Sequence, residues 1–153
     1  MKSKSRKKLA VALGLAGLVV VSGSYLAQAE GRIEVFSAEG CACCHEWIAH
    51  IEKSGYEVDS KVIDYDALDA IKTKAGLAPD QTSCHTAFLD GYLIEGHVPA
   101  REIDRLLKER PDAKGLAAPG MPVSAPGMNA GDEPYDVLLI HKDGSTEIYA
   151  HYR

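Results

Sequence analysis

Three of the four cysteines of this chain fall within four positions, at Cys41, Cys43 and Cys44. The fourth, Cys84, lies within the tetrapeptide Ser-Cys-His-Thr. Thiolate sulfur is a ligand that soft metal ions prefer, and two cysteines spaced as C-x-x-C are also the redox pair of thiol–disulfide enzymes. The cysteines therefore predict soft-metal binding or thiol chemistry, and they are the first candidates for a functional site.

The spacing of the cysteines favours copper over zinc. Cu(I) prefers thiolate and thioether ligands, and sulfurs that bridge can hold more than one such ion. Four thiolates also suit a closed tetrahedral zinc site, but zinc sites usually take cysteine pairs that stand two to four residues apart. The adjacent residues Cys43 and Cys44 fit that spacing poorly. We therefore expect copper as Cu(I), either as one ion or as a multinuclear group.

Five further side chains form a second tier of candidate metal ligands. His45 follows the cysteine cluster, His85 follows Cys84, and His97 precedes an expected helix. A hydrogen bond to a ligand is the alternative role for each of these histidines. The thioethers of Met121 and Met128 are soft ligands as well, and their alternative role is to fill a gap beneath a loop.

Residues 1–29 have the pattern of a secretory signal peptide. Five of the first eight residues are basic, an uncharged stretch follows, and Ala27-Gln28-Ala29 has small residues where a signal peptidase cleaves. We expect cleavage before Glu30, a periplasmic location, and a single domain over residues 30–153. The uncharged stretch could also just span a bilayer, so an uncleaved membrane anchor is the alternative.

The charge of the expected mature domain excludes some partners. Cleavage would remove five of the 17 basic residues and none of the 22 acidic ones. Such an acidic chain is a poor partner for nucleic acid or for an anionic membrane surface. It is compatible with a positively charged metal ion as the ligand.

The first half of the domain alternates between strands and helices. A helix is indicated by Trp47, Ile48 and Ile51, which lie three or four residues apart, and by Gly55 as its stop. The predicted elements are a strand over 33–37, a helix over 42–53, a strand over 56–63, and a helix that begins at Asp64 or Asp66 and ends near Gly76.

The second half contains two hairpins, a helix and an unusual loop. Asp90-Gly91 separates two apolar runs and predicts a hairpin, and Pro99 opens a helix that stops before Pro111. A loop rich in Pro, Gly and Met is expected over 115–131, where Ala-Pro-Gly-Met occurs twice. The last predicted element is a C-terminal hairpin over 135–150.

The order strand, helix, strand, helix, hairpin, helix resembles that of thioredoxin-like α/β proteins. The resemblance implies a central mixed sheet flanked by helices, with the Cys41 group at the end of the first strand. By the same resemblance, Cys84 takes the place of the residue that faces the C-x-x-C pair. The proline that redox enzymes of this fold carry after that residue is absent, because His85 stands there.

Several segments together resemble the CopG-type periplasmic copper-resistance proteins, a metal-binding family long described as a domain of unknown function. The matching segments are Cys41–Trp47, Ser83–Ala87, Gly91–Ala100, Gly115–Pro122 and Ala125–Met128. The resemblance implies a thioredoxin-like fold, an exported protein, and copper bound through the cysteines, with a multinuclear cluster allowed. Other periplasmic copper-handling proteins are then the expected protein partners.

Three hypotheses for function follow from these observations. The first is a periplasmic copper-binding protein of copper homeostasis or resistance, with or without redox conversion of the metal. The second is a thiol–disulfide oxidoreductase that uses Cys41 and Cys44. The third is a binding module whose cysteines form only structural disulfides, Cys41–Cys44 or Cys43–Cys84. The sequence indicates no catalytic residue beyond the cysteines.

Overall fold

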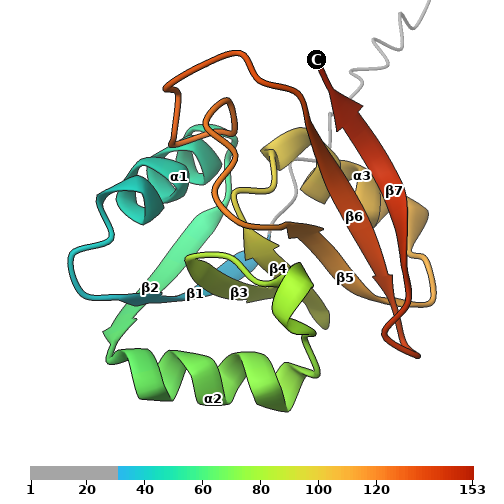
Figure 1. The fold of residues 1–153 in the computed structure, drawn as a ribbon, viewed down its shortest axis with the longest axis horizontal. Coiled ribbons are helices and arrows are strands. Elements are labelled where there is room, and N and C mark those ends of the chain that lie inside the picture. Colours follow the sequence, from blue (N-terminus) through green and yellow to red (C-terminus); the bar gives the residue numbers. More distant parts are fainter. Residues whose placement is uncertain (1–30) are drawn as a thin grey trace, which may run out of the picture.

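The computed structural model describes residues 31–153, so the predicted signal peptide lies outside the described residues. No helix in this part of the chain is long and apolar enough to cross a membrane. The elements, shown in Figure 1, are β1 (Arg32–Ala38), α1 (Ala42–Lys53), β2 (Glu57–Ile63), α2 (Tyr65–Ala75), the 3-10 helix η1 (Pro79–Gln81), β3 (His85–Leu89), β4 (Tyr92–Gly96), α3 (Ala100–Glu109), β5 (Ala113–Ala118), β6 (Tyr135–His141) and β7 (Thr146–Tyr152).

The strands of residues 31–153 form one mixed sheet in the order β2-β1-β3-β4-β5-β6-β7. β1 pairs parallel with β2 and antiparallel with β3, and β3 pairs antiparallel with β4. The predicted α/β class, with a central mixed sheet flanked by helices, is confirmed. So are the predicted order of elements up to α3 and the C-terminal hairpin, which is β6–β7.

The prediction of a loop throughout 115–131 is wrong at its N-terminal end. Residues Ala113–Ala118 form strand β5, which pairs parallel with β4 and antiparallel with β6. At Gly115 the strands approach so closely that an added Cβ would lie 1.8 Å from the carbonyl oxygen of Leu93. The glycine that suggested a loop is therefore a strand residue that permits close contact.

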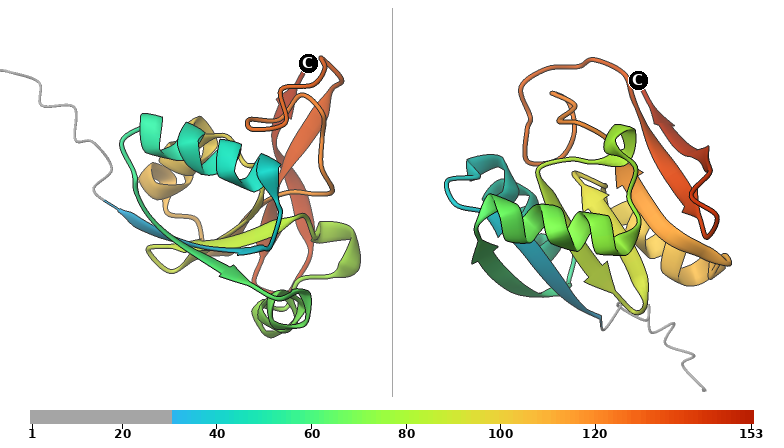
Figure 2. Two further views of the ribbon diagram at one scale, coloured as in Figure 1. Left: turned by 90° about the vertical axis from the view of Figure 1, so that its left-hand side faces the viewer. Right: turned by 60° about the horizontal axis from the view of Figure 1, so that its bottom comes forward.

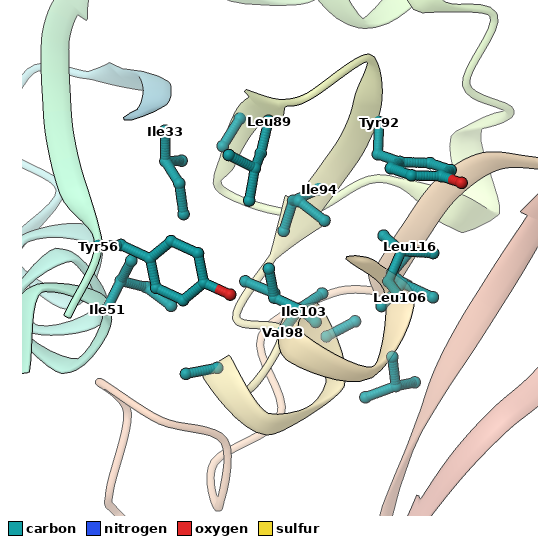
Figure 3. Close-up of a cluster of buried hydrophobic side chains, with 14 of the residues drawn as sticks. Ile33, Ile51, Tyr56, Leu89, Tyr92, Ile94, Val98, Ile103, Leu106 and Leu116 are labelled. Atoms are coloured by element: carbon teal, nitrogen blue, oxygen red, sulfur yellow. The ribbon is translucent and has the colours of Figure 1, made fainter. Parts of the chain in front are cut away.

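Helices α1 and α3 cover one face of the sheet, and α2 covers the other (Figure 2). The larger core lies under α1 and α3, because both helices place apolar side chains against the sheet (Figure 3). Trp47 of α1 is fully buried, and its indole Nε1 donates to the carbonyl of Val98 over 2.8 Å. This bond ties α1 to the chain that enters α3, and so fixes the helix that contains Cys43 and Cys44 and begins after Cys41.

Candidate metal centre

The three early cysteines lie at the start of α1. Cys41 is the N-cap residue and makes no side-chain capping bond, while Cys43 and Cys44 belong to the first turn. Cys44 is fully buried, whereas Cys41 and Cys43 are half-buried. The start of α1, with its N-cap, therefore has two partly exposed cysteines and one in the interior.

Cys84 reaches the same place from another part of the chain. It immediately precedes β3, whose residue His85 pairs with Ser37 near the end of β1. The Sγ atoms of all four cysteines lie within 4.8 Å of one another, and those of Cys41 and Cys43 are 3.6 Å apart. The antiparallel pairing of β1 with β3 thus brings the late sulfur next to the early three.

The cysteine group is in a partly oxidised form. Cys41 and Cys44 are joined by a disulfide, while Cys43 and Cys84 are free thiols. The sulfurs of a disulfide are not thiolates, so four thiolates are present at this site only after the disulfide has taken up two electrons. Burial, followed by the neighbouring Cys43, raises the pKa of the Cys84 thiol to about 12. A metal ion that binds Cys84 must therefore displace its proton.

Two of the second-tier histidines contact Cys84. The Cys84 sulfur lies 3.0 Å from Nε2 of His97 and 3.4 Å from Nδ1 of His85. Nδ1 of His97 lies 2.6 Å from the carbonyl oxygen of Pro126, which only accepts, so Nδ1 carries the proton and Nε2 has a free lone pair. Burial lowers the pKa of both imidazoles, which keeps them neutral. Each neutral ring can therefore accept a hydrogen bond from the Cys84 thiol or bind a metal ion, without taking up the thiol proton.

The remaining second-tier residues differ in position. Met121 is 56% exposed and lines the groove beside the cysteines. Met128 is half-buried and does not line this groove. His45 is exposed on α1 and belongs to neither group of potential metal ligands among residues 31–153. The structure thus brings His85 and His97 to Cys84 and Met121 to the groove, whereas His45 belongs to neither group of potential ligands and Met128 does not line the groove.

A groove of about 810 Å³ opens at the cysteines. One wall carries Cys41, Cys43 and Cys84, and the wall opposite is formed by α2, with Tyr65 and Asp69 among its lining residues. A ligand or a partner that approaches through this groove meets sulfur on one side and the side chains of α2, with both aspartate and lysine, on the other.

Four residues beside the cysteines were not predicted from the sequence. Lys72 and Glu95 are buried and form an ion pair, which also involves the hydroxyl of Thr86 and the backbone amide of Ser83. The sequence does contain one indication that Lys72 is buried. It lies four residues after Leu68, so both side chains are on the buried side of α2. Glu95 interrupts an apolar strand, which is an equally readable sign of a buried charge.

Comparison with known proteins agrees with this geometry. Residues 81–128, from just before Cys84 to Met128, match the model of a family described as protein of unknown function, DUF411. A comparison with curated proteins finds no match. A solved structure of copper resistance protein CopG, Form 2, is 39% identical with a TM-score of 0.74, and the match covers 81% of this chain and 99% of that chain.

A second solved structure of the same protein, Form 1, is 40% identical with a TM-score of 0.74, and the match covers 79% of this chain and 96% of that chain. Both matches extend over nearly the whole CopG chain at an identity well above that of shared fold alone. The resemblance predicted from the cysteine and glycine motifs is thereby confirmed: this chain belongs to the family of CopG-type copper resistance proteins.

Proposed function

We propose that this protein binds Cu(I) in the periplasm, as part of copper homeostasis or resistance, with Cys41, Cys43, Cys44 and Cys84 as its ligands. The observation that carries the proposal is the presence of four sulfur atoms within 4.8 Å of one another. Thiolates at this separation can bridge neighbouring Cu(I) ions, so the proposal includes a multinuclear site. The family supports copper as the metal, because the related solved structures are of copper resistance proteins.

The neutral side chains around Cys84 support the same proposal. Nε2 of His97 points its lone pair at the Cys84 sulfur, and the groove gives Met121 access to the same sulfurs. Imidazole and thioether both complete the coordination of Cu(I) without adding negative charge. We therefore include His97 and Met121 as further ligands.

The test is a titration of the reduced protein with Cu(I), without oxygen, against a competing chelator. We expect tight binding by the wild type and a loss of affinity of at least about tenfold, or 1.4 kcal/mol, when Cys84 is replaced by serine. His45→Gln is the matched control, because His45 lies outside the cysteine group and should leave the affinity unchanged. Equal affinities for wild type and Cys84→Ser would contradict the proposed ligand set.

Redox conversion of copper is a finer part of the proposal. Oxidation of the Cys41 and Cys44 thiols to a disulfide releases two electrons and two protons, which suffices to reduce two Cu(II) to two Cu(I). The Cys41–Cys44 disulfide has the form that such an oxidation would leave, which supports the proposal. Reduced protein mixed with Cu(II) should lose two thiols for every two Cu(I) captured by a chelator, and Cys44→Ser should lose this stoichiometry.

A thiol–disulfide oxidoreductase is the second candidate, because Cys41 and Cys44 form a C-x-x-C disulfide at a helix start. One contact disfavours it. A polypeptide substrate would need free backbone groups beside Cys84, but the Thr82 carbonyl already accepts from the amide of Gly120 over 2.8 Å. An insulin-reduction assay separates the candidates, and we expect a rate no higher than that of a Cys44→Ser variant.

The periplasmic location and the cleavage before Glu30 have their own test. Fractionation of cells that express the full chain should recover the protein with the periplasmic contents, and its N-terminal sequence should begin at Glu30. A protein recovered with the membrane fraction, with residues 1–29 intact, would favour the anchor instead.

A further inference from the structure

A buried ion pair lies beside Cys84, and its lysine is among the residues that line the groove. Glu95 of β4 is fully buried and Lys72 of α2 is 8% exposed. The Lys72 ammonium donates to Glu95 over 2.5 Å and to the hydroxyl of Thr86 over 2.9 Å. That hydroxyl donates in turn to the second oxygen of Glu95 over 2.7 Å. Both oxygens of the carboxylate are thus engaged by fixed partners.

The same carboxylate also holds the backbone next to Cys84. The oxygen of Glu95 that accepts from Lys72 accepts from the amide of Ser83 over 2.7 Å. The Ser83 hydroxyl donates to the carbonyl of Gly120 on the opposite side. At Gly96 an added Cβ would lie 2.5 Å from the Ser83 side chain, so Ser83 packs directly on the backbone of β4. Ser83 is therefore held from three directions.

A buried ion pair is a poor source of stability, because the cost of removing two charges from water offsets most of their attraction. Apolar residues of similar volume often serve as well. Here the carboxylate does one thing that an apolar residue would not do, since it binds an amide N–H one residue before Cys84. The contact with Ser83 therefore indicates that the role of the Glu95 carboxylate is to place Cys84 rather than to stabilise the fold.

We propose that Glu95, fixed by Lys72 and Thr86, is a positioning residue that sets the Cys84 sulfur opposite the cysteines of α1. The proposal rests on the proposed Cu(I) site and adds residues that touch no metal. Lys72 comes from α2, on the face of the sheet opposite α1 (Figure 1). Helix α2 is thereby coupled to the geometry of a ligand, in the manner of partners that orient metal ligands from outside the coordination sphere.

The test compares two double variants that differ only in whether residue 95 can accept a hydrogen bond. Lys72→Met with Glu95→Gln removes both charges and keeps an amide oxygen for Ser83. Lys72→Met with Glu95→Leu removes the charges and the acceptor together. Each reduced protein is loaded with Cu(I), and its affinity is measured against a chelator. Each loaded protein is then treated with iodoacetamide, and the alkylation of every cysteine is followed by mass spectrometry.

We expect the Gln variant to behave as the wild type, with all four cysteines protected by copper. In the Leu variant we expect the alkylation of Cys84 alone to rise, and Cu(I) affinity to fall, by about tenfold or more. A merely structural role would expose the four cysteines equally. Protection of Cys84 and unchanged affinity in the Leu variant would overturn the proposal.

A milder variant serves if the Leu variant does not fold. Thr86→Val keeps the shape of residue 86 and removes only the hydroxyl that orients Glu95. We expect a selective rise in the alkylation of Cys84, and an unchanged rate would overturn the proposal. Failure of the wild type to bind Cu(I) is a different outcome, because it would refute the proposed function itself.

Discussion

The two copies of Ala-Pro-Gly-Met have the same sequence but differ in the surroundings of their glycine and methionine residues. In the first copy, residues 118–121, an added Cβ at Gly120 would meet nothing within 4 Å, and Met121 is mostly exposed at the groove. The alanine of each copy is fully buried, but in the second copy, residues 125–128, the Pro126 carbonyl accepts a hydrogen bond from His97. An added Cβ at Gly127 would lie 2.6 Å from the backbone nitrogen of Trp47.

The difference shows that the role of this tetrapeptide depends on the part of the fold against which it packs. The first turn begins at the end of β5 and places Met121 among the residues that line the groove beside the cysteines. The second turn lies against the backbone of α1 and supports a histidine that contacts Cys84. We therefore expect the first turn to matter for copper binding and the second to matter for the shape of the site.

The largest effect should come from Gly127→Ala. The new Cβ would contact the backbone of α1 at Trp47 and at the Cys43 carbonyl, 2.6 and 2.9 Å away, so neither neighbour can rotate aside. The glycine also has a φ of +87°, which disfavours any side chain. We expect a loss of about 3 kcal/mol or more in the free energy of unfolding, measured in urea.

Gly120→Ala is the matched control for this change. Gly120 also has a positive φ, +66°, but no atom lies near the new Cβ. Only the conformational penalty remains, and we expect a loss of about 1 kcal/mol. Equal losses for the two variants would mean that the second turn does not press on α1.

The second effect concerns the methionines. Met121→Leu removes a soft ligand from the groove and keeps the volume of the side chain, and we expect Cu(I) affinity to fall by about tenfold. Met128→Leu is the control, because Met128 does not line the groove, and its affinity should equal that of the wild type. A loss of affinity in Met128→Leu but not in Met121→Leu would show that the second turn, and not the first, supplies a copper ligand.

The smallest effect should be a pH dependence of the free energy of unfolding, caused by His50 beside the second turn. His50 lies in a pocket with Pro126 and Gly127, and its Nε2 accepts from the amide of Ala100 at the start of α3 over 3.2 Å. Burial, and then Lys53, lower the pKa of His50. The unfolded chain therefore binds the proton more readily, so this contribution to stability is present at neutral pH and is lost as the pH falls below about 6.5.

Replacement by glutamine removes the titration and leaves an oxygen that can accept. Between pH 7.5 and 5.5, we expect the stability of His50→Gln to fall less than that of the wild type, by about 1 kcal/mol at most. Cu(I) affinity should not change, because the effect belongs to the support of α3. Parallel stability curves for the two proteins would show that His50 does not act in this way.

Much of the fold was predictable because its elements carry local signals. The apolar spacing in α1, the Asp90-Gly91 turn and the C-terminal hairpin each depend on residues close in sequence. Strand β5 was missed because its residues, Ala-Lys-Gly-Leu-Ala-Ala, have little strand preference of their own. They form a strand because β4 and β6 pair with them from both sides, and those contacts are distant in the chain.

The candidate site also has a part that the sequence predicts and a part that depends on distant contacts. The cysteines stood out by residue type and spacing, and the element order indicated where Cys84 would lie. The support of Ser83 by Glu95 could not be predicted, because it depends on the pairing of β3 with β4 and on the packing of α2. Likewise, two identical tetrapeptides carry nothing in their own residues to tell which one contacts α1.

Helix α1 begins without the usual means of neutralising its positive end. Cys41 makes no side-chain bond at the N-cap, and the first turn contains no acidic residue. Four thiolates that bind fewer than four Cu(I) ions carry a net negative charge, which would lie at this end of the helix dipole. Metal binding should then slow amide hydrogen exchange in the first turn of α1. The exchange rate of these amides would therefore show whether the site holds metal.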